Sequence, residues 1–164
     1  MNTDDIITDV LKREDDEETN DPLDAGGRTK YGISEKANPE AWADGKVDEE
    51  EARRIYERKY VIGPGFDKVT DFQLRAQLVD FGVNSGPMIA IHKLQEVLQT
   101  ADPTVDVDYI LGPQTLGAIT QWHPEAINNA LVKARVKMIC RIVTKNPTQL
   151  KWLNGWVNRA LEFI

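Results

Sequence analysis

Residues 13–34 read REDDEETNDPLDAGGRTKYGIS, and this stretch separates two unlike parts of the chain. It contains Asn-Asp-Pro and a Gly-Gly pair, which are typical of loops and turns. Before it, Thr3 can cap a short helix whose apolar side consists of Ile6, Ile7, Val10 and Leu11. After residue 48, apolar residues recur at helical spacing almost to the end of the chain. The pattern predicts a mainly α protein with one short β-like or irregular insert near residues 15–34.

Capping and breaking residues mark the later helices. Asp48 with Glu51 resembles a capping box that opens one helix, and Gly63-Pro64-Gly65 ends it. We expect a sharp turn at residues 84–87 between the next two helices. Together with the first helix, the sequence predicts seven to eight helices, the later ones beginning near Asp71, Pro87, Gln114, Pro124 and Leu150.

The length of 164 residues predicts a single domain. We divide it into an N-terminal lobe of about residues 1–70 and a helical C-terminal lobe of about residues 71–164. The net charge of −7 comes from one block, because residues 1–24 hold ten acids and two bases while the other 140 residues hold 17 acids and 18 bases. An acidic N-terminus argues against binding nucleic acid, which requires clustered Lys and Arg.

Other features narrow the class of protein. No apolar run reaches the length of a membrane span, and the first residues, MNTDDIITDVLKRE, do not have the pattern of a secretory signal. The single cysteine, Cys140, allows no internal disulfide, and its isoleucine neighbours predict burial. His92 and His123 have no second ligand at metal-binding spacing, so we expect neither a metal nor a cofactor. Four tryptophans are candidates for stacking on sugar rings, but we expect the last two to pack in the core: Trp42, Trp122, Trp152 and Trp156.

Glu14 and Asp24 are the candidates for acid–base chemistry. Glu14 follows Val10 by four residues and Leu11 by three, so it continues the apolar side of the first helix. Partial removal from water favours the protonated carboxyl group, which a general acid requires. Asp24 lies in a loop where it can stay ionised, and glycoside hydrolysis uses two such unlike carboxyl groups. The alternative is that Glu14 only ends a helix and Asp24 only forms a turn.

Several segments resemble a known family. Residues 13–34 resemble the opening motif of the phage and bacterial N-acetylmuramidases of glycoside hydrolase family 108. Asp80 to Pro87, DFGVNSGP, is similar to a turn of that family. LGPQT at residues 111–115 resembles a segment of its C-terminal half, often described as peptidoglycan-binding, and LNGWVNR at residues 153–159 resembles its closing pattern. The resemblance runs in order over nearly the whole chain.

The resemblance implies a lysozyme-like fold and an endolysin-type muramidase that cleaves the β-1,4 bond between N-acetylmuramic acid and N-acetylglucosamine. It implies that Glu14 is the general acid, and that Asp24 and Thr29 position water or stabilise the transition state. We expect peptidoglycan as the partner, with no nucleic acid, no stable membrane insertion and a monomeric chain. A phage-encoded enzyme would gather in the host cytoplasm and reach the periplasm and wall through a holin-type pore. Candidate substrate-binding residues are Arg28, Lys30, Tyr31, Asn84 and Ser85.

One departure from the family motif keeps alternatives open. The family's glutamate precedes two glycines, whereas Asp15 and Asp16 follow Glu14, and a gapless alignment would put Asp15 at the catalytic position. Glu14 is preferred because it stays on the apolar side of the helix and has the longer reach. A non-catalytic peptidoglycan-binding protein of the same fold and a lytic transglycosylase are the rival interpretations.

Overall fold

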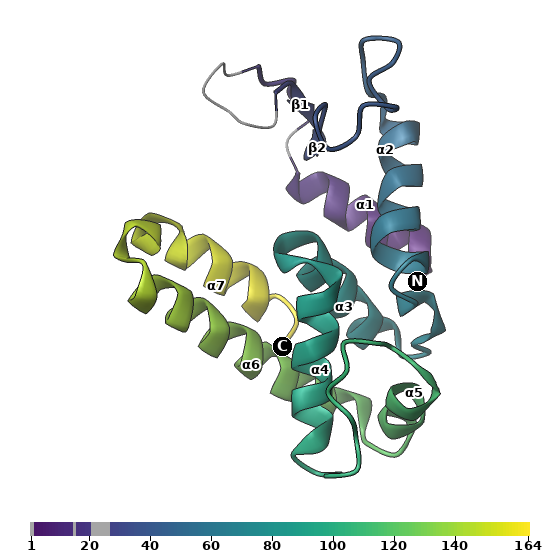
Figure 1. The fold of residues 1–164 in the computed structure, drawn as a ribbon, viewed down its shortest axis with the longest axis vertical. Coiled ribbons are helices and arrows are strands. Elements are labelled where there is room, and N and C mark those ends of the chain that lie inside the picture. Colours follow the sequence, from purple (N-terminus) through teal and green to yellow (C-terminus); the bar gives the residue numbers. More distant parts are fainter. Residues whose placement is uncertain (1, 15, 21–26) are drawn as a thin grey trace. The chain divides into compact units, whose positions relative to one another are not determined.

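The computed structural model describes residues 2–14, 16–20 and 27–164. The chain forms two units, Met1–Gly63 and Pro64–Ile164, each with its own core (Figure 1). The mainly α class with a small two-stranded sheet is confirmed. Within the described residues, no helix is both long and apolar enough to cross a membrane.

The first unit begins with helix α1 (Thr3–Arg13). Asn2, and not Thr3, caps this helix, because the Asn2 side chain accepts a hydrogen bond from the Asp5 N–H while the Asp5 carboxylate accepts one from the Asn2 N–H. The four predicted apolar residues are buried. The helix ends at Arg13, and the next residue, Glu14, caps it with an extended backbone. Packing of the apolar side of α1 against the core of the unit therefore sets the position of Glu14, the residue directly after the helix.

The predicted insert contains a two-stranded hairpin. Strands β1 (Thr29–Lys30) and β2 (Ile33–Ser34) are antiparallel, with Thr29 opposite Ser34 and Lys30 opposite Ile33. The turn residues Tyr31 and Gly32 both have positive φ, at 51° and 68°, as a two-residue type I′ turn requires. Thr19 forms an isolated bridge with Thr29, which ties the chain after α1 to the first strand.

Helix α2 (Glu49–Tyr56) completes the first unit and continues directly as the π-helical segment η1 (Glu57–Ile62). The predicted Asp48–Glu51 capping box is present. Arg53 connects α2 to α1, because its Nη1 donates to Asp4 Oδ1 and to Thr8 Oγ1, both at 3.0 Å. Tyr56 is 3% exposed and faces the core of this unit.

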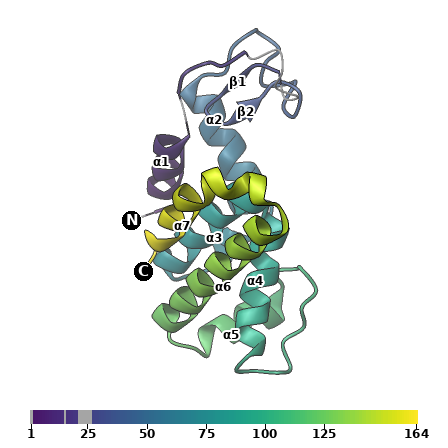
Figure 2. The ribbon, with the colours of Figure 1, turned by 90° about the vertical axis from the view of Figure 1, so that its left-hand side faces the viewer.

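The regular elements of the second unit are all helical. Helices α3 (Phe72–Ser85), α4 (Pro87–Gln99) and α6 (Pro124–Lys145) pack on one another. Figure 2 shows α6 and the shorter α7 (Leu153–Leu161) running side by side. The remaining elements are the short helix α5 (Pro113–Thr120) and the 3₁₀ segments η2 (Phe66–Lys68) and η3 (Pro147–Trp152). The centre of this core is formed by Leu74, Leu78, Phe81, Leu94, Leu98, Ile127 and Leu131.

A buried carboxylate joins three helices of this unit. Asp80 on α3 accepts from Arg135 Nη2 of α6 at 2.7 Å and from Arg159 Nε of α7 at 2.8 Å. Asp80 and Arg135 are almost fully buried, and the Arg135 guanidinium lies 4.9 Å from the centre of the Phe81 ring. Buried charges are tolerated only when they are paired in this way.

The structure changes three details of the predicted second unit. Helix α3 continues through Asn84 and Ser85, and the reversal falls on Gly86 alone, at a φ of 95°. Cys140 is exposed, because it lies one residue past buried Ile139 and thus about 100° around α6. Trp152 is 52% exposed, since it ends the 3₁₀ segment η3 and does not lie on the buried side of α7.

Candidate active site

Glu14 lies where α1 meets the hairpin turn. Its backbone N–H donates to Val10 O at 3.1 Å, which closes the last turn of α1. Its carboxyl group reaches Gly32: a Cβ atom built on Gly32 would lie 2.7 Å from Glu14 Oε2 and 2.7 Å from the Tyr56 hydroxyl oxygen. A side chain at this position would force the Glu14 carboxyl group or the Tyr56 hydroxyl group to move, and the positive φ of 68° also favours glycine, so glycine lets the carboxyl group lie this close to the turn.

Two tyrosines from α2 and η1 lie around the same carboxyl group. The Tyr56 hydroxyl donates to Tyr31 O at 2.8 Å, and the Tyr56 and Tyr60 ring centroids are 5.5 Å apart. Burial raises the pKa of Tyr60, and the negative charge of Glu14 raises it further. Glu14 is thus placed by the end of α1, by the hairpin turn and by the helix that carries both tyrosines.

The Glu14 side chain is half-buried and opens onto a surface pocket of the first unit whose lining is partly polar and partly apolar. The pocket has a volume of about 420 Å³. Acidic and basic groups share its wall, as in the ion pair between Arg53 Nη2 and Glu49 Oε1 at 2.9 Å. Lining residues come from α1, the segment just after it, the turn and α2: Thr8, Leu11, Lys12, Glu14, Asp16, Tyr31, Glu49 and Arg53.

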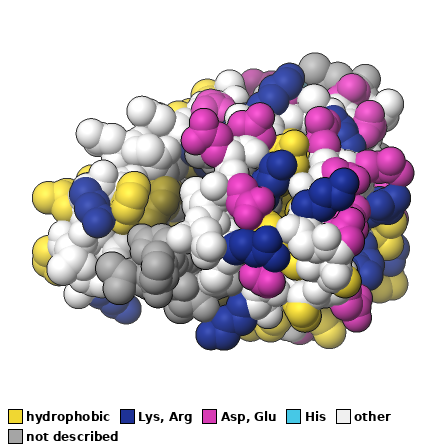
Figure 3. Space-filling model, turned by 90° about the horizontal axis from the view of Figure 1, so that it is seen from above, with side chains coloured by type: hydrophobic (Ala, Val, Ile, Leu, Met, Phe, Trp, Pro, Cys, Tyr) yellow, Lys and Arg dark blue, Asp and Glu magenta, His cyan; other side chains and the backbone are white. Residues whose placement is uncertain are grey.

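The surface charge is mixed. Figure 3 shows acidic and basic side chains next to one another over much of the face that it draws. Arg53 pairs with Asp4 of the N-terminal acidic block, and Arg54 pairs with Glu50 at 2.9 Å. Among the described residues, no three His, Cys, Asp or Glu side chains gather as metal ligands would.

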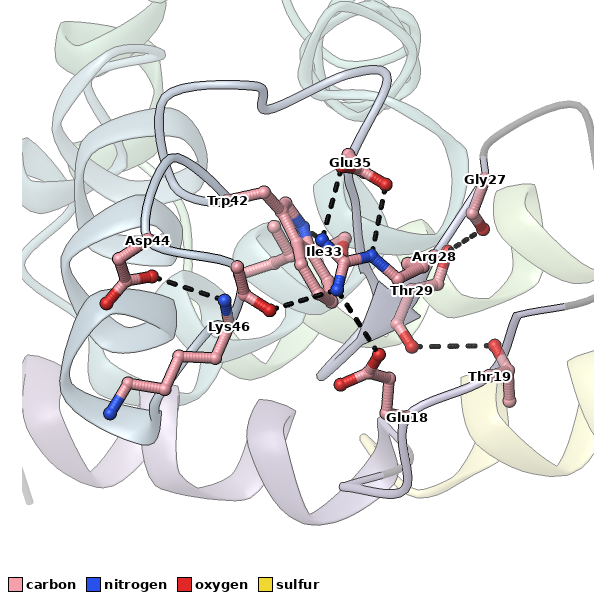
Figure 4. Close-up of polar contacts among 11 residues, drawn as sticks. Glu18, Thr19, Gly27, Arg28, Thr29, Ile33, Glu35, Trp42, Asp44 and Lys46 are labelled. Carbon is pink, nitrogen blue, oxygen red and sulfur yellow. Dashed lines mark hydrogen bonds and ion pairs between the residues drawn. The ribbon is translucent and has the colours of Figure 1, made fainter.

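Thr29 lies on β1 of the hairpin whose turn contacts Glu14. Its N–H and C=O groups pair with Thr19, each at 2.9 Å, and its hydroxyl donates to Gly27 O at 3.4 Å (Figure 4). Lys30 follows, with its ammonium 5.4 Å from the centre of the Tyr31 ring. The structure therefore brings Glu14 and Tyr31 into one pocket and places Thr29 and Lys30 on the adjoining strand. Asp24 and Asp15 lie outside the described residues.

Arg28 is held by contacts within the first unit (Figure 4). It donates to both Glu35 oxygens, at 3.2 and 3.3 Å, and to Gly45 O at 3.0 Å, and its guanidinium lies 4.6 Å from the centre of the Trp42 ring. The Glu35 hydrogen bond raises the pKa of Arg28. Trp42 is buried and donates to Ile33 O at 3.2 Å. Arg28 and Trp42 thus fasten the hairpin to the loop that follows it.

Asn84 and Ser85 lie in the second unit, at the end of α3. Ser85 Oγ donates to Asn84 Oδ1 at 3.4 Å. Both line a largely apolar pocket of about 430 Å³. Its other lining residues come from α4, α6 and α7: Ile89, Met138, Ile139, Ile142 and Trp156.

Sequence reasoning missed Tyr56, Tyr60 and Arg53 as neighbours of the candidate acid. Tyr56 occupies an apolar position of a predicted helix, so its pattern shows burial but not the contact with Tyr31. The Glu49–Arg53 spacing of four residues did carry a signal, because such pairs form on one side of a helix.

A half-buried carboxyl group on a pocket wall, between the end of the first helix and a short hairpin, is an arrangement that suits acid–base chemistry. Residues 7–86 match the family model described as Glycosyl hydrolase 108. Residues 89–161 match the model described as Predicted Peptidoglycan domain. Residues 7–86 thus match the glycosyl hydrolase 108 family, and the chain is a glycoside hydrolase that acts on peptidoglycan.

The fold is also similar to a solved structure, described as the structure of Brucella abortus SagA. The TM-score is 0.73 at 27% sequence identity, over 98% of this chain and 90% of that one. The lysozyme-like fold class is confirmed by this match. A comparison with curated proteins gives no match.

Proposed function

We propose that the protein is a muramidase that hydrolyses the β-1,4 bond between N-acetylmuramic acid and N-acetylglucosamine, with Glu14 as the general acid. The observation that carries the proposal is the place of Glu14: its carboxyl group lies on the wall of a surface pocket, against the backbone of a hairpin turn. The family match supports peptidoglycan as the substrate.

In this mechanism Glu14 gives its proton to the glycosidic oxygen as the bond to the sugar breaks. Positive charge develops on the sugar, and a water molecule then attacks it. The resemblance assigns Asp24 to stabilising that charge or holding the water, with Thr29 helping to place the water. Tyr31, on the wall beside Glu14, is positioned to contact the sugar, and Lys30 and Arg28 are the further candidates on the hairpin.

Asn84 and Ser85 are proposed as contacts for peptidoglycan in the second unit. Their pocket combines an amide and a hydroxyl group with apolar side chains and the Trp156 indole. Sugar rings bind to such surfaces, because their apolar faces pack on aromatic rings while their polar groups accept and donate hydrogen bonds.

The biological setting that we propose is lysis of a bacterial host by a phage-encoded endolysin. It rests on the resemblance of residues 13–34 to the phage enzymes. In that setting the enzyme would accumulate in the host cytoplasm and pass through a holin-type pore to the wall. Expression in a Gram-negative host with and without a holin tests it, since clearing of the culture should require both proteins.

The test of the reaction compares Glu14→Gln, Asp15→Asn and Asp24→Asn in the clearing of chloroform-treated Gram-negative cells. We expect Glu14→Gln to lower the rate by about 10²–10⁴, the usual contribution of a general acid. Glu50→Gln is the matched control, because it makes the same chemical change in an exposed ion pair. Full activity of Glu14→Gln together with inactive Asp15→Asn would transfer the role to Asp15.

Product analysis separates hydrolysis from the rival reaction. A reducing-end muramic acid identifies hydrolysis, whereas a 1,6-anhydro product identifies a lytic transglycosylase. Absence of any cleavage by the wild type, with peptidoglycan binding retained, would identify a non-catalytic binding protein.

A further inference from the structure

Tyr56 lies behind the wall of the Glu14 pocket. Glu14 and Tyr31 line the pocket, but Tyr56 does not, and only 3% of Tyr56 is exposed. Its hydroxyl group nevertheless reaches the pocket wall, because it donates to the carbonyl oxygen of Tyr31 at 2.8 Å. This bond joins α2 to the hairpin turn, across 25 residues of sequence.

The turn that receives this hydrogen bond has a strained backbone. Tyr31 has a φ of 51°, in the left-handed region. Asparagine or glycine commonly occupies this position of a type I′ turn, and a tyrosine there is unfavourable. Such conformations are unfavourable and persist only where surrounding contacts enforce them. The Tyr56 hydroxyl bond is such a contact, formed directly with Tyr31.

The Tyr31–Gly32 turn also limits where the Glu14 carboxyl group can lie. Gly32 follows Tyr31, and the position of its missing Cβ is 2.7 Å from both Glu14 Oε2 and the Tyr56 hydroxyl oxygen. The carboxyl group and the tyrosine hydroxyl thus meet on one face of the same glycine. A shift of the turn would move the surface against which Glu14 is packed.

We propose that Tyr56 is a positioning residue for the reaction: its buried hydroxyl holds the Tyr31–Gly32 turn in place, and the turn fixes the carboxyl group of Glu14. This proposal rests on the proposed role of Glu14 as the acid. A misplacement of a catalytic group by about 1 Å can reduce a rate by about 10²-fold. A residue that holds the Glu14 carboxyl group in place therefore affects kcat. Because Tyr56 does not line the pocket, it leaves substrate affinity unchanged.

The test is Tyr56→Phe, which keeps the buried ring and removes only the hydroxyl group. Activity is measured as new reducing ends on soluble glycan strands of peptidoglycan, so that kcat and KM are obtained separately. We expect kcat to fall at least about 10-fold while KM stays within about twofold. Tyr109→Phe is the matched control: Tyr109 also has a positive φ, and its hydroxyl forms no hydrogen bond within the described ranges.

A second variant changes Gly32, the glycine that Glu14 and the Tyr56 hydroxyl group both contact. Gly32→Ala places a methyl group against both Glu14 and the Tyr56 hydroxyl, and should lower kcat by about 10²-fold or more. Coupling through the turn is measured with Tyr31→Gly, which removes the backbone strain. In that background the Tyr56→Phe effect on kcat should shrink to less than about threefold, since residues in contact are not additive.

Circular dichroism and a thermal melt establish that each variant is folded at the assay temperature. Unchanged kcat in Tyr56→Phe or in Gly32→Ala overturns the proposal. So does a rise in KM without a fall in kcat, because that result would make Tyr56 a substrate contact. Wild type and Glu14→Gln are measured alongside: an active Glu14→Gln would instead refute the role of Glu14 itself.

Discussion

The buried Asp80 carboxylate should be among the most sensitive positions for stability. It bridges Arg135 and Arg159, and of these Arg135 has no exposed side-chain surface. Asp80→Asn keeps the size and one acceptor oxygen but removes the charge, which leaves the Arg135 guanidinium buried without that counter-ion. Removal of one partner of a buried ion pair costs about 3–5 kcal/mol.

That magnitude gives a measurable shift. For a chain of this length, a loss of 1 kcal/mol lowers Tm by about 2–4 °C, so we expect Asp80→Asn to lower Tm by about 6–20 °C. The assay is a thermal melt followed by far-ultraviolet circular dichroism. Arg159→Met should cost less, because Arg159 is 19% exposed and the Arg135–Asp80 pair remains.

The control for this series is again Glu50→Gln. Glu50 and Arg54 form an exposed ion pair at 2.9 Å, close to the 2.7 and 2.8 Å of the two Asp80 pairs, and exposed pairs contribute little to stability. Its Tm should change by no more than about 2 °C. A Tm shift for Asp80→Asn as small as that of the control would refute the argument that this carboxylate holds the three helices together.

Three further outcomes follow from the polar contacts. Arg28→Met should lower the midpoint of urea unfolding of the first unit, measured by Trp42 fluorescence, because it removes the hydrogen bonds to Glu35. An unchanged midpoint with a raised KM would make Arg28 a substrate contact instead. Gln95→Leu should cost about 1–3 kcal/mol in urea unfolding, since this buried amide bonds four groups around residues 108–115. Hydrogen bonds from Ile110 N–H and Gln95 lower the folded-state pKa of Asp108. The contribution of Asp108 to stability is therefore present above about pH 4 and is lost as the pH falls through that lowered pKa. Asp108→Asn should reduce this acid dependence in thermal melts between about pH 5 and 2.

Local patterns were enough to predict most of the helices and the candidate acid. The apolar spacing of α1 extends to Glu14, and the structure places that side chain on a pocket wall. Gly86 and the capping residues act over two to four positions, so their effects can be read from the sequence. The same local patterns predicted the insert near residues 15–34. They did not predict the bounds of its two strands, because these depend on the Tyr31–Gly32 turn.

Contacts between distant residues could not be predicted from a single sequence. The sequence indicates Arg28 as a candidate sugar contact, but it does not show that Arg28 also binds Glu35 and Gly45 O and packs on Trp42. Cys140 has apolar neighbours, yet the direction in which it points depends on which side of α6 is covered by α3 and α4. The Tyr56–Tyr31 bond joins two segments whose approach is set by the packing of α1 on α2.

The division into family segments differs from the division into structural units. The glycosyl hydrolase match ends at residue 86 and thus includes α3, but α3 belongs to the second unit, where it packs on α4 and α6. Asp80 on α3 pairs with Arg135 and Arg159, which both lie in the peptidoglycan segment. A chain cut between residues 86 and 89 would leave Asp80 without both arginines and α3 without its core. Residues 64–86 of the glycosyl hydrolase segment therefore fold together with the peptidoglycan segment, as parts of the second unit.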